Sequence, residues 1–545
     1  METSKHFCSL DELANTPINY VALEGALRQY PKVDDAAILK EGFRNGFKIP
    51  YIGSRDYYEA KNHGSVNSNP HIVRKKLEEE VDAGRVAGPF TKIPIANLRI
   101  SPLGLVPKST PGEFRLIFDL SHPHGSSVNS GIAPDQSSVE YTHFDEVTKM
   151  VKNMGVGSYL VKVDIKSAFR LLPINPSDFN LLGMVFDGNY YVDKSLPFGL
   201  SVSCALFEKF STFLEWFIKH KTQNENLIHY LDDFCGGARE KHEAHKLLQQ
   251  MLLLFKELGV PVAQEKVEGP TTELKFLGLV VDTNRMEVRL PRDKIEDLMQ
   301  CIDEILGRYK KSVTLKKLQS LIGKLNFACR AVRPGRVFNR RLINATMGAS
   351  KPFHRVRVTH EMCEDLRVWR SFLSDFNGIS VILPRWESNE AVAMYTDASG
   401  ALGYGAYVQG HWSAGTWPEW ILKGNFSITF MEMLPIVLAV YLWGPLLANK
   451  IIVINCDNEA VVECINKQTS RSKPVAHLIR IFVLQCLNIN SVFRAKHVPG
   501  SLNEIADSLS RLQWEKFKRL APQADVLQTP VPDSLWQVLK GKSGG

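Results

Sequence analysis

Three acidic residues in the first half of the chain have the surroundings of a phosphoryl-transfer site. Asp164 ends the apolar run SYLVKVD and is followed by a predicted helix start. Asp232 and Asp233 stand together in YLDD between apolar residues, which predicts a tight hairpin with both acids at its tip. Such a pair alone usually marks only a turn. Carboxylates at the ends of two adjacent strands, however, can hold two Mg²⁺ ions about 4 Å apart, as phosphoryl transfer requires.

Two further segments have features that a nucleotide substrate needs. Lys108 and Arg115 flank the turn Ser-Thr-Pro-Gly, and a hairpin there could bring two cations onto a triphosphate. The segment LPFGLS, with Phe198 and Gly199, opens a predicted helix beside a glycine, where a flat base could pack against the backbone. Each feature alone is weak, since a basic hairpin is normally only a solvated surface.

A second set of acids lies in a later section of the chain. Asp397 lies where a predicted strand meets a glycine turn, Glu432 lies in an apolar helix, Asp457 follows the strand IIVINC, and Asp507 lies in NEIADSLSR. Each has an ordinary explanation, such as the dipole for an acid in a first helical turn and capping for Asp457 before Asn458. Together the four could form one acidic cage that binds two divalent ions and activates water against a phosphodiester.

The elements that must position these acids suggest an α+β or α/β multidomain protein. No chemistry stands out in residues 1–70. Short β-rich runs alternate with helical patterns in residues 71–290, and residues 291–390 are mainly helical. A new β-rich section with helices spans residues 391–511, and residues 512–545 are predicted to be a flexible tail with three prolines.

Basic residues are concentrated in one segment. Residues 308–360 contain 14 Lys or Arg and no Asp or Glu, although the net charge of the chain is only +8. A block of like charge is commonly solvated or disordered. Here, apolar residues recur at helical spacing behind Thr314, a predicted N-cap, so the segment is expected to fold and to face a polyanion such as nucleic acid. Six residues are expected to contact phosphates without sequence choice: Lys316, Lys317, Lys324, Arg333, Arg336 and Arg340.

Composition and targeting patterns exclude several classes. The chain has 545 residues, 44% hydrophobic and 23% charged, which is typical of a globular protein with several domains. No secretory signal and no apolar run long enough for a bilayer is visible, so no membrane association is expected. Nine scattered cysteines without a C-x-x-C pair argue against a zinc site and a disulfide framework. These features favour an intracellular location, in the cytoplasm, the nucleus or both.

The first set of motifs, in its order and spacing, resembles the reverse transcriptases, and the Y-x-D-D box makes the match specific. The resemblance implies a right-hand polymerase with fingers, palm and thumb, with Asp164 and Asp232 as metal ligands and Asp233 in support. It places Phe169 at the bulky position that excludes a ribose 2′-hydroxyl, and so implies the use of dNTPs. Phe198 stands where the family often has Gln. The segment LKFLG at 274–278 resembles the primer grip, and Lys266 lies where a lysine sometimes protonates pyrophosphate.

The second set resembles ribonuclease H, because TDASG, ME, CDNEA and HVPGSLNEIAD appear in that order. This resemblance implies a ribonuclease H-like α/β domain that binds an RNA–DNA hybrid through Asp397, Glu432, Asp457 and Asp507. Ribonucleases H with a mobile histidine carry it after the Val-Pro-Gly turn, where this chain has Ser501, so His497 is expected to be structural. The implied partners are an RNA template, a DNA primer, the hybrid and dNTPs, with Mg²⁺, or Mn²⁺, at both sites.

Three flanking segments look like DIRS-type retroelements, which integrate with a tyrosine recombinase: LQSLIGKLNFACR, RPGRVFNRRL and RLQWEKFKRLAP. Two alternatives to an active enzyme remain open. One is a domesticated, non-catalytic nucleic-acid-binding protein derived from such an element. The other is a structural or assembly protein whose basic section gathers RNA. The acids expected at both sites are all present, and this favours the enzyme, because loss of function usually erodes such residues first.

Overall fold

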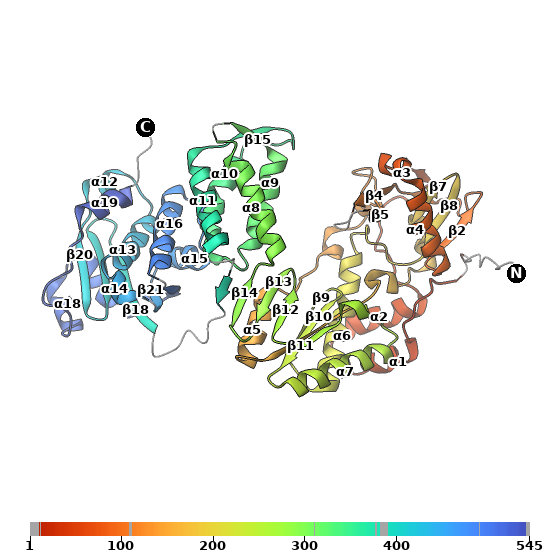
Figure 1. Cartoon of the computed structure of the whole chain (residues 1–545), viewed down its shortest axis with the longest axis horizontal. Coiled ribbons are helices and arrows are strands. Elements are labelled where there is room, and N and C mark those ends of the chain that lie inside the picture. The colour runs from red at the N-terminus through yellow and green to blue at the C-terminus, as the bar shows by residue number, and fades with distance from the viewer. Residues whose placement is uncertain are drawn as a thin grey trace. The chain divides into compact units, whose positions relative to one another are not determined.

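The chain forms two compact units, each of which mixes helices and sheets (Figure 1). The computed structural model describes residues 10, 12–107, 112–309, 311–375, 379–381, 391–448, 450–489 and 491–540, and only the backbone of 375 and 379–381. The first unit comprises residues 1–277 and 281–285, and the second comprises 278–280 and 286–545. The predicted mixed α/β multidomain architecture is therefore confirmed.

The first unit is built on two sheets and a hairpin. Its central sheet has the strand order β11-β6-β10-β9, its second sheet has the order β1-β3-β7-β8-β2, and β4 pairs with β5. The strands are β1 (Tyr58–Glu59), β2 (Val86–Phe90), β3 (Arg99–Ile100), β4 (Leu103–Pro107), β5 (Phe114–Phe118), β6 (Tyr159–Asp164), β7 (Gly183–Phe186), β8 (Asn189–Asp193), β9 (Leu227–Tyr230), β10 (Asp233–Ala238) and β11 (Glu268–Thr271). Strands β12 (Glu273–Phe276) and β13 (Leu279–Asp282) lie at the boundary between the units.

The helices of the first unit are α1 (Tyr20–Leu27), α2 (Val33–Asn45), α3 (Gly64–Ser68), α4 (Pro70–Asp82), α5 (Phe144–Met154), α6 (Ser203–Thr222) and α7 (Lys241–Glu257), with short 3-10 turns that include η3 (Ala168–Leu171), η4 (Pro176–Leu181) and η5 (Gln264–Lys266). Helix α6 buries Phe207, Phe210, Leu214 and Phe217 on one side, at the spacing of an amphipathic helix. These residues belong to the core of this unit, next to the central sheet.

Residues before position 70 are part of that core. Leu23 of α1 and Leu39 of α2 are fully buried in it, and the ring of Tyr30 lies 5.3 Å from that of Phe213 in an edge-on arrangement. The sequence assigned this segment no role, because its mixed pattern has no motif. The structure gives it a packing role against α6.

The second unit begins with a helical segment of α8 (Arg292–Leu306), α9 (Leu315–Ala328), α10 (Arg336–Ala345) and α11 (His360–Asp375). Small strands accompany them: β14 (Glu287–Arg289) pairs with β17 (Ile379–Val381), and β15 (Ser312–Thr314) pairs with β16 (Arg355–Arg357). The predicted helix behind Thr314 is confirmed as α9. Thr314 is its N-cap, because its side chain accepts a hydrogen bond from the Lys317 amide.

A five-stranded sheet follows, with the order β20-β19-β18-β21-β22, in which the first two pairings are antiparallel and the last two are parallel. Its strands are β18 (Ala391–Ala398), β19 (Gly403–Val408), β20 (His411–Thr416), β21 (Ile451–Cys456) and β22 (Val492–His497). The helices around it are α12 (Glu419–Lys423), α13 (Ile428–Leu442), α14 (Gly444–Leu447), α15 (Glu459–Lys467), α16 (Lys473–Asn488), α17 (Glu504–Ser510), α18 (Trp514–Leu520) and α19 (Asp533–Lys540). Helix α13 is mostly apolar and largely buried, as expected for a central helix, and Glu432 is its one acid.

Residues 512–540 pack instead of forming the flexible tail that the sequence predicts for residues 512–545. The ring of Phe517 lies 4.9 Å from that of Trp412, and the Trp412 indole N–H donates to the Asp525 carbonyl at 2.7 Å. The three prolines of this segment suggested mobility, but its aromatic residues find partners on β20. No helix in the described part of the chain is both long and apolar enough to cross a bilayer.

Candidate active sites

The central sheet of the first unit brings the three acids of the first set together. Strand β10 pairs with β6 so that Asp233 lies directly opposite Asp164, and the Ile165 amide donates to the Asp232 carbonyl at 2.9 Å. Asp164 is buried, and Asp232 and Asp233 are half-buried. The acids therefore converge at one end of two adjacent strands, the arrangement that their position in the sequence predicts.

A strained turn presents Asp232. Tyr230 pairs with Asp233, so Leu231 and Asp232 form a two-residue hairpin loop. Leu231 has a φ of 52°, whereas Asp232 does not have a positive φ, and this combination is typical of a type II′ turn. Glycine is the usual residue at that first position, and a leucine there is strained. Contacts of Leu231 with the core of the unit offset this strain.

A lysine faces the first acid. The Lys266 Nζ atom lies 2.9 Å from both carboxylate oxygens of Asp164, and this hydrogen bond raises the pKa of Lys266. Burial raises the pKa of Asp233 to about 6, and the neighbouring Asp164 adds to the effect; Lys162 opposes it. Burial also raises the pKa of Asp232. Since Oδ1 of Asp233 is buried without a hydrogen-bond partner, this group of acids has capacity for a cation.

Two of the predicted nucleotide-contacting residues, Phe169 and Phe198, lie against each other. Phe169 is in η3, directly after β6, and its ring is 5.0 Å from that of Phe198 in an edge-on arrangement. Phe169 is buried, whereas Phe198 is 65% exposed. The Gly199 backbone approaches β5 so closely that a Cβ atom would lie 1.9 Å from the Phe118 carbonyl oxygen. Arg115 is exposed on β5, and Lys108 lies outside the described residues.

The second unit brings the four later acids together around one sheet edge. Asp397 lies near the end of β18, Asp457 directly follows the parallel neighbour β21, Glu432 lies in α13 and Asp507 lies in α17. Ligand atoms of Glu432, Asp457 and Cys456 lie within 4.8 Å of one another. The Ser510 hydroxyl donates to Asp397 Oδ2, and the Arg511 Nε atom lies 2.5 Å from Asp507 Oδ1.

Burial and mutual repulsion dominate the electrostatics of this cluster. Burial, together with the charges of Asp397 and Asp457, raises the pKa of Glu432 to about 9. Burial raises the pKa of Asp397 to about 6, and Asp457 and Asp507 add to the effect while Ser510 opposes it. The Glu432 side chain is buried and its Oε2 atom has no hydrogen-bond partner. A buried, unpartnered carboxylate oxygen among other acids fits a divalent cation.

Several neighbours of these acids were missed in the sequence. Ser510 and Cys456 contact the second cluster, and the Asn503 side-chain Nδ2 donates to the Thr396 carbonyl at 2.9 Å, next to Asp397. Spacing alone does not mark them, because each is an ordinary residue at a helix or strand end. His497 contacts the Asp457 carbonyl at 3.2 Å through Nε2, which is compatible with the structural role expected for it. The eight cysteines in the described part of the chain are free.

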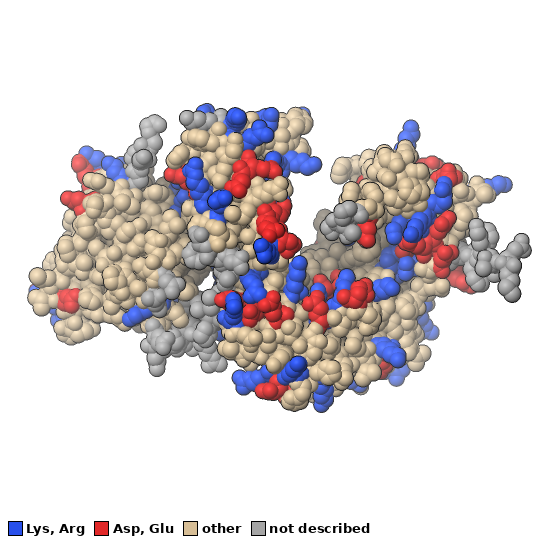
Figure 2. Space-filling model, viewed as in Figure 1, with Lys and Arg blue, Asp and Glu red and all other residues tan. Residues whose placement is uncertain are grey.

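The basic segment is partly neutralised by acids outside it. Lys317 pairs with Glu304, and Lys324 lies 2.7 Å from Asp297, both acids being on α8. Figure 2 shows Lys and Arg residues gathered near β15 and acidic residues mixed with basic ones along the helices. The charge counted within residues 308–360 alone therefore overstates the positive charge of this surface. Lys316 and Arg336 are exposed, and Arg340 is half-buried.

Comparisons with known proteins agree with this geometry. Residues 106–281 match the family model described as reverse transcriptase (RNA-dependent DNA polymerase). The transposon Tf2-3 and Tf2-4 polyproteins of Schizosaccharomyces pombe are each 21% identical over 454 residues, which cover 80% of this chain and 30% of each polyprotein. The foamy viral protease-reverse transcriptase dRH, solved in complex with ds DNA, covers 88% of this chain and 81% of its own, with 15% identity and a TM-score of 0.50.

Residues 106–281 are therefore a reverse transcriptase domain, and a further α/β domain follows it in the chain. The chain is similar to the polyproteins of the Tf2 transposons. The chain spans about a third of the length of these curated relatives. The likeness to the foamy viral structure shows the fold alone.

Proposed function

We propose that this protein is the RNA-directed DNA polymerase of a retroelement, and that its second unit carries a ribonuclease H that cleaves the RNA strand of RNA–DNA hybrids. The observation that carries the proposal is the convergence of two separate acid groups, one at the β6–β10 ladder and one around β18 and β21. The first group lies at strand ends, and the second combines the ends of two strands with the helices α13 and α17. Each group contains a carboxyl group with a raised pKa, Asp233 in the first and Glu432 in the second, and a bound divalent cation would stabilise its charged form.

At the first site, Asp164 and Asp232 are the proposed metal ligands, and Asp233 supports them. Two Mg²⁺ ions, or Mn²⁺, would lower the pKa of the primer 3′-hydroxyl and stabilise the pyrophosphate leaving group. Lys266, whose pKa is raised by its hydrogen bond to Asp164, is proposed to donate a proton to pyrophosphate. Phe169 is proposed to exclude a ribose 2′-hydroxyl, and Phe198 and Gly199 to pack against the incoming nucleotide. Arg115 and Lys108 are proposed to contact its triphosphate.

At the second site, Asp397, Glu432, Asp457 and Asp507 are the proposed ligands of a second pair of divalent ions. Ser510 orients the Asp397 carboxylate through its hydroxyl, and Arg511 fixes Asp507. The exposed basic side chains near α9 and α10 are proposed to contact phosphates of the hybrid and so to give affinity without sequence choice. The intracellular location and the relationship to DIRS-type elements remain predictions from the sequence.

The proposal is tested by separating the two activities. Primer extension on an RNA template with dNTPs and hybrid cleavage are measured for wild type, Asp232→Asn and Asp457→Asn in Mg²⁺ and in Mn²⁺. We expect Asp232→Asn to abolish extension and spare cleavage, and Asp457→Asn to do the reverse, because the two acids lie in different units. Each change keeps the size of the side chain and removes one negative charge.

Matched controls are available in both units. Asp187→Asn removes an exposed acid of the first unit that pairs with Arg74, and Asp525→Asn removes an exposed acid of the second unit that pairs with His411. Both controls should retain both activities. Loss of both activities in a folded Asp232→Asn variant would contradict the two-site assignment. A wild-type protein that binds the hybrid but extends no primer would favour the domesticated, non-catalytic alternative.

A further inference from the structure

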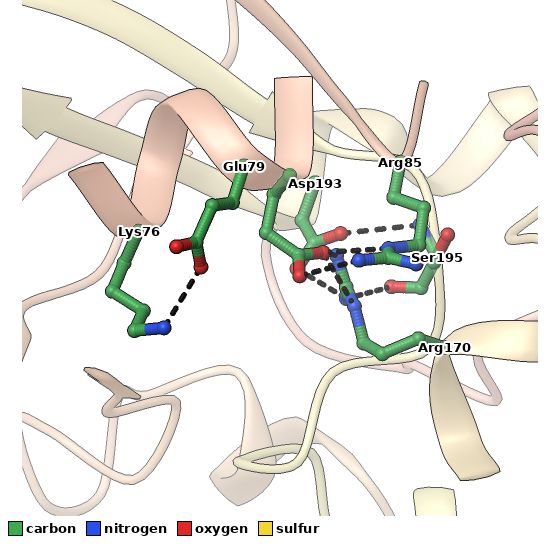
Figure 3. Close-up of polar contacts among 7 residues, drawn as sticks. Lys76, Glu79, Arg85, Arg170, Asp193 and Ser195 are labelled. Atoms are coloured by element: carbon green, nitrogen blue, oxygen red, sulfur yellow. Dashed lines mark hydrogen bonds and ion pairs between the residues drawn. The ribbon is translucent and has the colours of Figure 1, made fainter. Parts of the chain in front are cut away.

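A buried arginine connects three segments of the first unit (Figure 3). Arg170 follows Phe169 in η3 and is 8% exposed. Its Nη1 atom donates to Asp193 Oδ2 at 2.8 Å and to the Ser195 carbonyl at 3.1 Å. Its Nε and Nη2 atoms donate to Glu80 Oε2 at 3.0 and 2.8 Å. The guanidinium therefore links η3 to helix α4 and to the segment that follows β8.

The network is closed and its charges balance. Arg85 also holds Glu80, through bonds of 2.8 Å to each carboxylate oxygen, so two arginines face two acids. The Asp193 Oδ1 atom accepts the Ser195 amide at 3.1 Å. Burial opposes ionisation of Glu80, but hydrogen bonds from Arg85 and Arg170 lower its pKa to about 2. A buried ion pair of this kind tolerates the loss of one partner poorly, because the remaining charge is left without compensation.

The segment that Arg170 holds leads directly to the predicted nucleotide pocket. Ser195 begins the run Ser-Leu-Pro-Phe, and Phe198 lies three residues further on, in contact with the Phe169 ring. The Leu196 amide also donates to the Leu172 carbonyl at 2.9 Å, so the two chain segments run together. The guanidinium thus bonds to the backbone three residues before Phe198 and belongs to the residue next to Phe169.

The backbone before Phe169 needs such an anchor. Ser167 has a φ of 64° and Ala168 a φ of 21°, and both values are unfavourable for residues with a side chain. Strained backbone of this kind persists only where surrounding contacts fix it. The four hydrogen bonds of Arg170 are such contacts, since they begin two residues after Ala168.

We infer that Arg170 is a positioning residue that fixes Phe169 against Phe198 and thereby sets the room available at the sugar 2′ position of an incoming nucleotide. The inference rests on the proposed polymerase function. Loosening the network would let Phe169 move, so a ribonucleotide would be rejected less strongly. The effect should fall on the binding of nucleotides and not on the binding of primer–template.

The test compares wild type with Arg170→Lys, which keeps the charge and loses the planar fork, and with Glu80→Gln, which removes a partner without changing η3. Incorporation of a single dNTP and of the matching rNTP is measured on an RNA template. We expect discrimination against the rNTP to fall about tenfold in both variants, because small misplacements in such pockets have effects of this order or larger. The change should appear mainly in KM. Arg74→Gln, which removes an exposed arginine of the same helix as Glu80, should behave as wild type.

A second measurement separates this inference from the proposed function. Binding of dATP and ATP to the protein with a chain-terminated primer–template is measured by calorimetry, without any catalysis. If Arg170→Lys does not fold, Glu80→Gln decides alone. Unchanged dATP preference and unchanged discrimination in a variant with lowered thermal stability would make the network purely structural and overturn the inference. If wild type prefers dATP but extends no primer, and the variants lose the preference, the inference is supported although the polymerase proposal fails. A wild type without any preference would overturn the inference.

Discussion

A buried histidine next to the YLDD hairpin gives a prediction that can be worked out in numbers. His229 lies on β9, one residue before Tyr230, and its side chain is 5% exposed. Its Nδ1 atom lies 2.5 Å from Glu215 Oε2 and its Nε2 atom lies 3.1 Å from Glu208 Oε1, both glutamates being on α6. Because both ring nitrogens face carboxylates, the doubly protonated imidazolium satisfies both contacts.

The protonation of His229 stabilises the hairpin below a defined pH. Burial lowers the pKa of His229, but the hydrogen bonds to Glu208 and Glu215 outweigh burial and raise it to about 9, from the usual 6.5. This difference corresponds to on the order of 3 kcal/mol of free energy of unfolding. Since the pKa is higher in the folded state, the contribution is complete below pH 6.5 and is lost as the pH rises through about 9. Lys219, which lies 2.6 Å from Glu215, retains part of the compensation.

The perturbation is His229→Gln, which removes the charge and leaves two half-buried carboxylates with one amide donor group between them. Opening of the hairpin is measured by hydrogen–deuterium exchange of peptides that cover β9 and β10, because a chain of two units does not unfold in a single step. At pH 7 we expect about a hundredfold loss of protection, the equivalent of the 3 kcal/mol above. Wild type should lose protection between pH 7 and 9, beyond the change in intrinsic exchange, and the variant should not.

The control is His242→Gln, at an exposed position on α7, which should keep wild-type protection. Protection of the wild-type hairpin that is independent of pH up to 9 would refute the reasoning, since a neutral imidazole would then be holding α6. So would full protection in His229→Gln.

Four further predictions follow from the same structure. Phe169→Ala should admit ribonucleotides, which single-nucleotide incorporation measures; unchanged discrimination would remove Phe169 from the proposed role. Glu432→Gln should raise the melting temperature of the metal-free protein at pH 8 by at least about 2 °C. The reason is that an acid with its pKa raised to about 9 in the folded state costs stability as the pH rises above 4.5. The variant should also lose any increase in melting temperature caused by Mg²⁺. Gly199→Ala should lower stability by about 1–3 kcal/mol, because its Cβ would overlap the Phe118 carbonyl, and a protease-susceptibility assay of the folded protein would detect this. Lys316→Ala should reduce the log–log salt dependence of hybrid binding by about 1, whereas Lys324→Ala should reduce it less, because Lys324 is paired with Asp297; equal slopes in fluorescence anisotropy would contradict this.

The positions of Asp164, Asp397 and Asp457 can be predicted from the sequence because each lies at or near the end of a short apolar strand pattern. An apolar run that stops at Asp164, and a two-residue loop between Tyr230 and Asp233, are local features that determine strand ends and a turn. Pairing of the two strands then brings the acids together with no further information. The helix behind Thr314 is predicted for the same reason, because its cap and its apolar spacing lie within one window.

Contacts between distant segments could not be read in this way. Lys266 meets Asp164 across 102 residues, and Glu80 meets Arg170 across 90. Composition likewise fails where neutralising acids lie just outside the counted window, as Glu304 does for Lys317. Aromatic partners can also order a segment with several prolines, as Trp412 does for the residues around Phe517. In each case the deciding term is tertiary packing or pairing, which one-dimensional patterns do not encode.

The two acid groups relieve their repulsion in different ways, and this difference has a chemical consequence. The first group has an internal cation, because Lys266 bonds to both oxygens of Asp164. In the second, Arg511 and Lys516 pair with Asp507, but no described cation pairs with Glu432, which with its pKa of about 9 holds a proton at neutral pH. Divalent ions that bind the first group must compete with an ammonium, whereas ions that bind the second must displace a proton. Metal affinity at the second site should therefore rise more steeply with pH up to about 9, so cleavage and extension should differ in their pH dependence at limiting metal concentration.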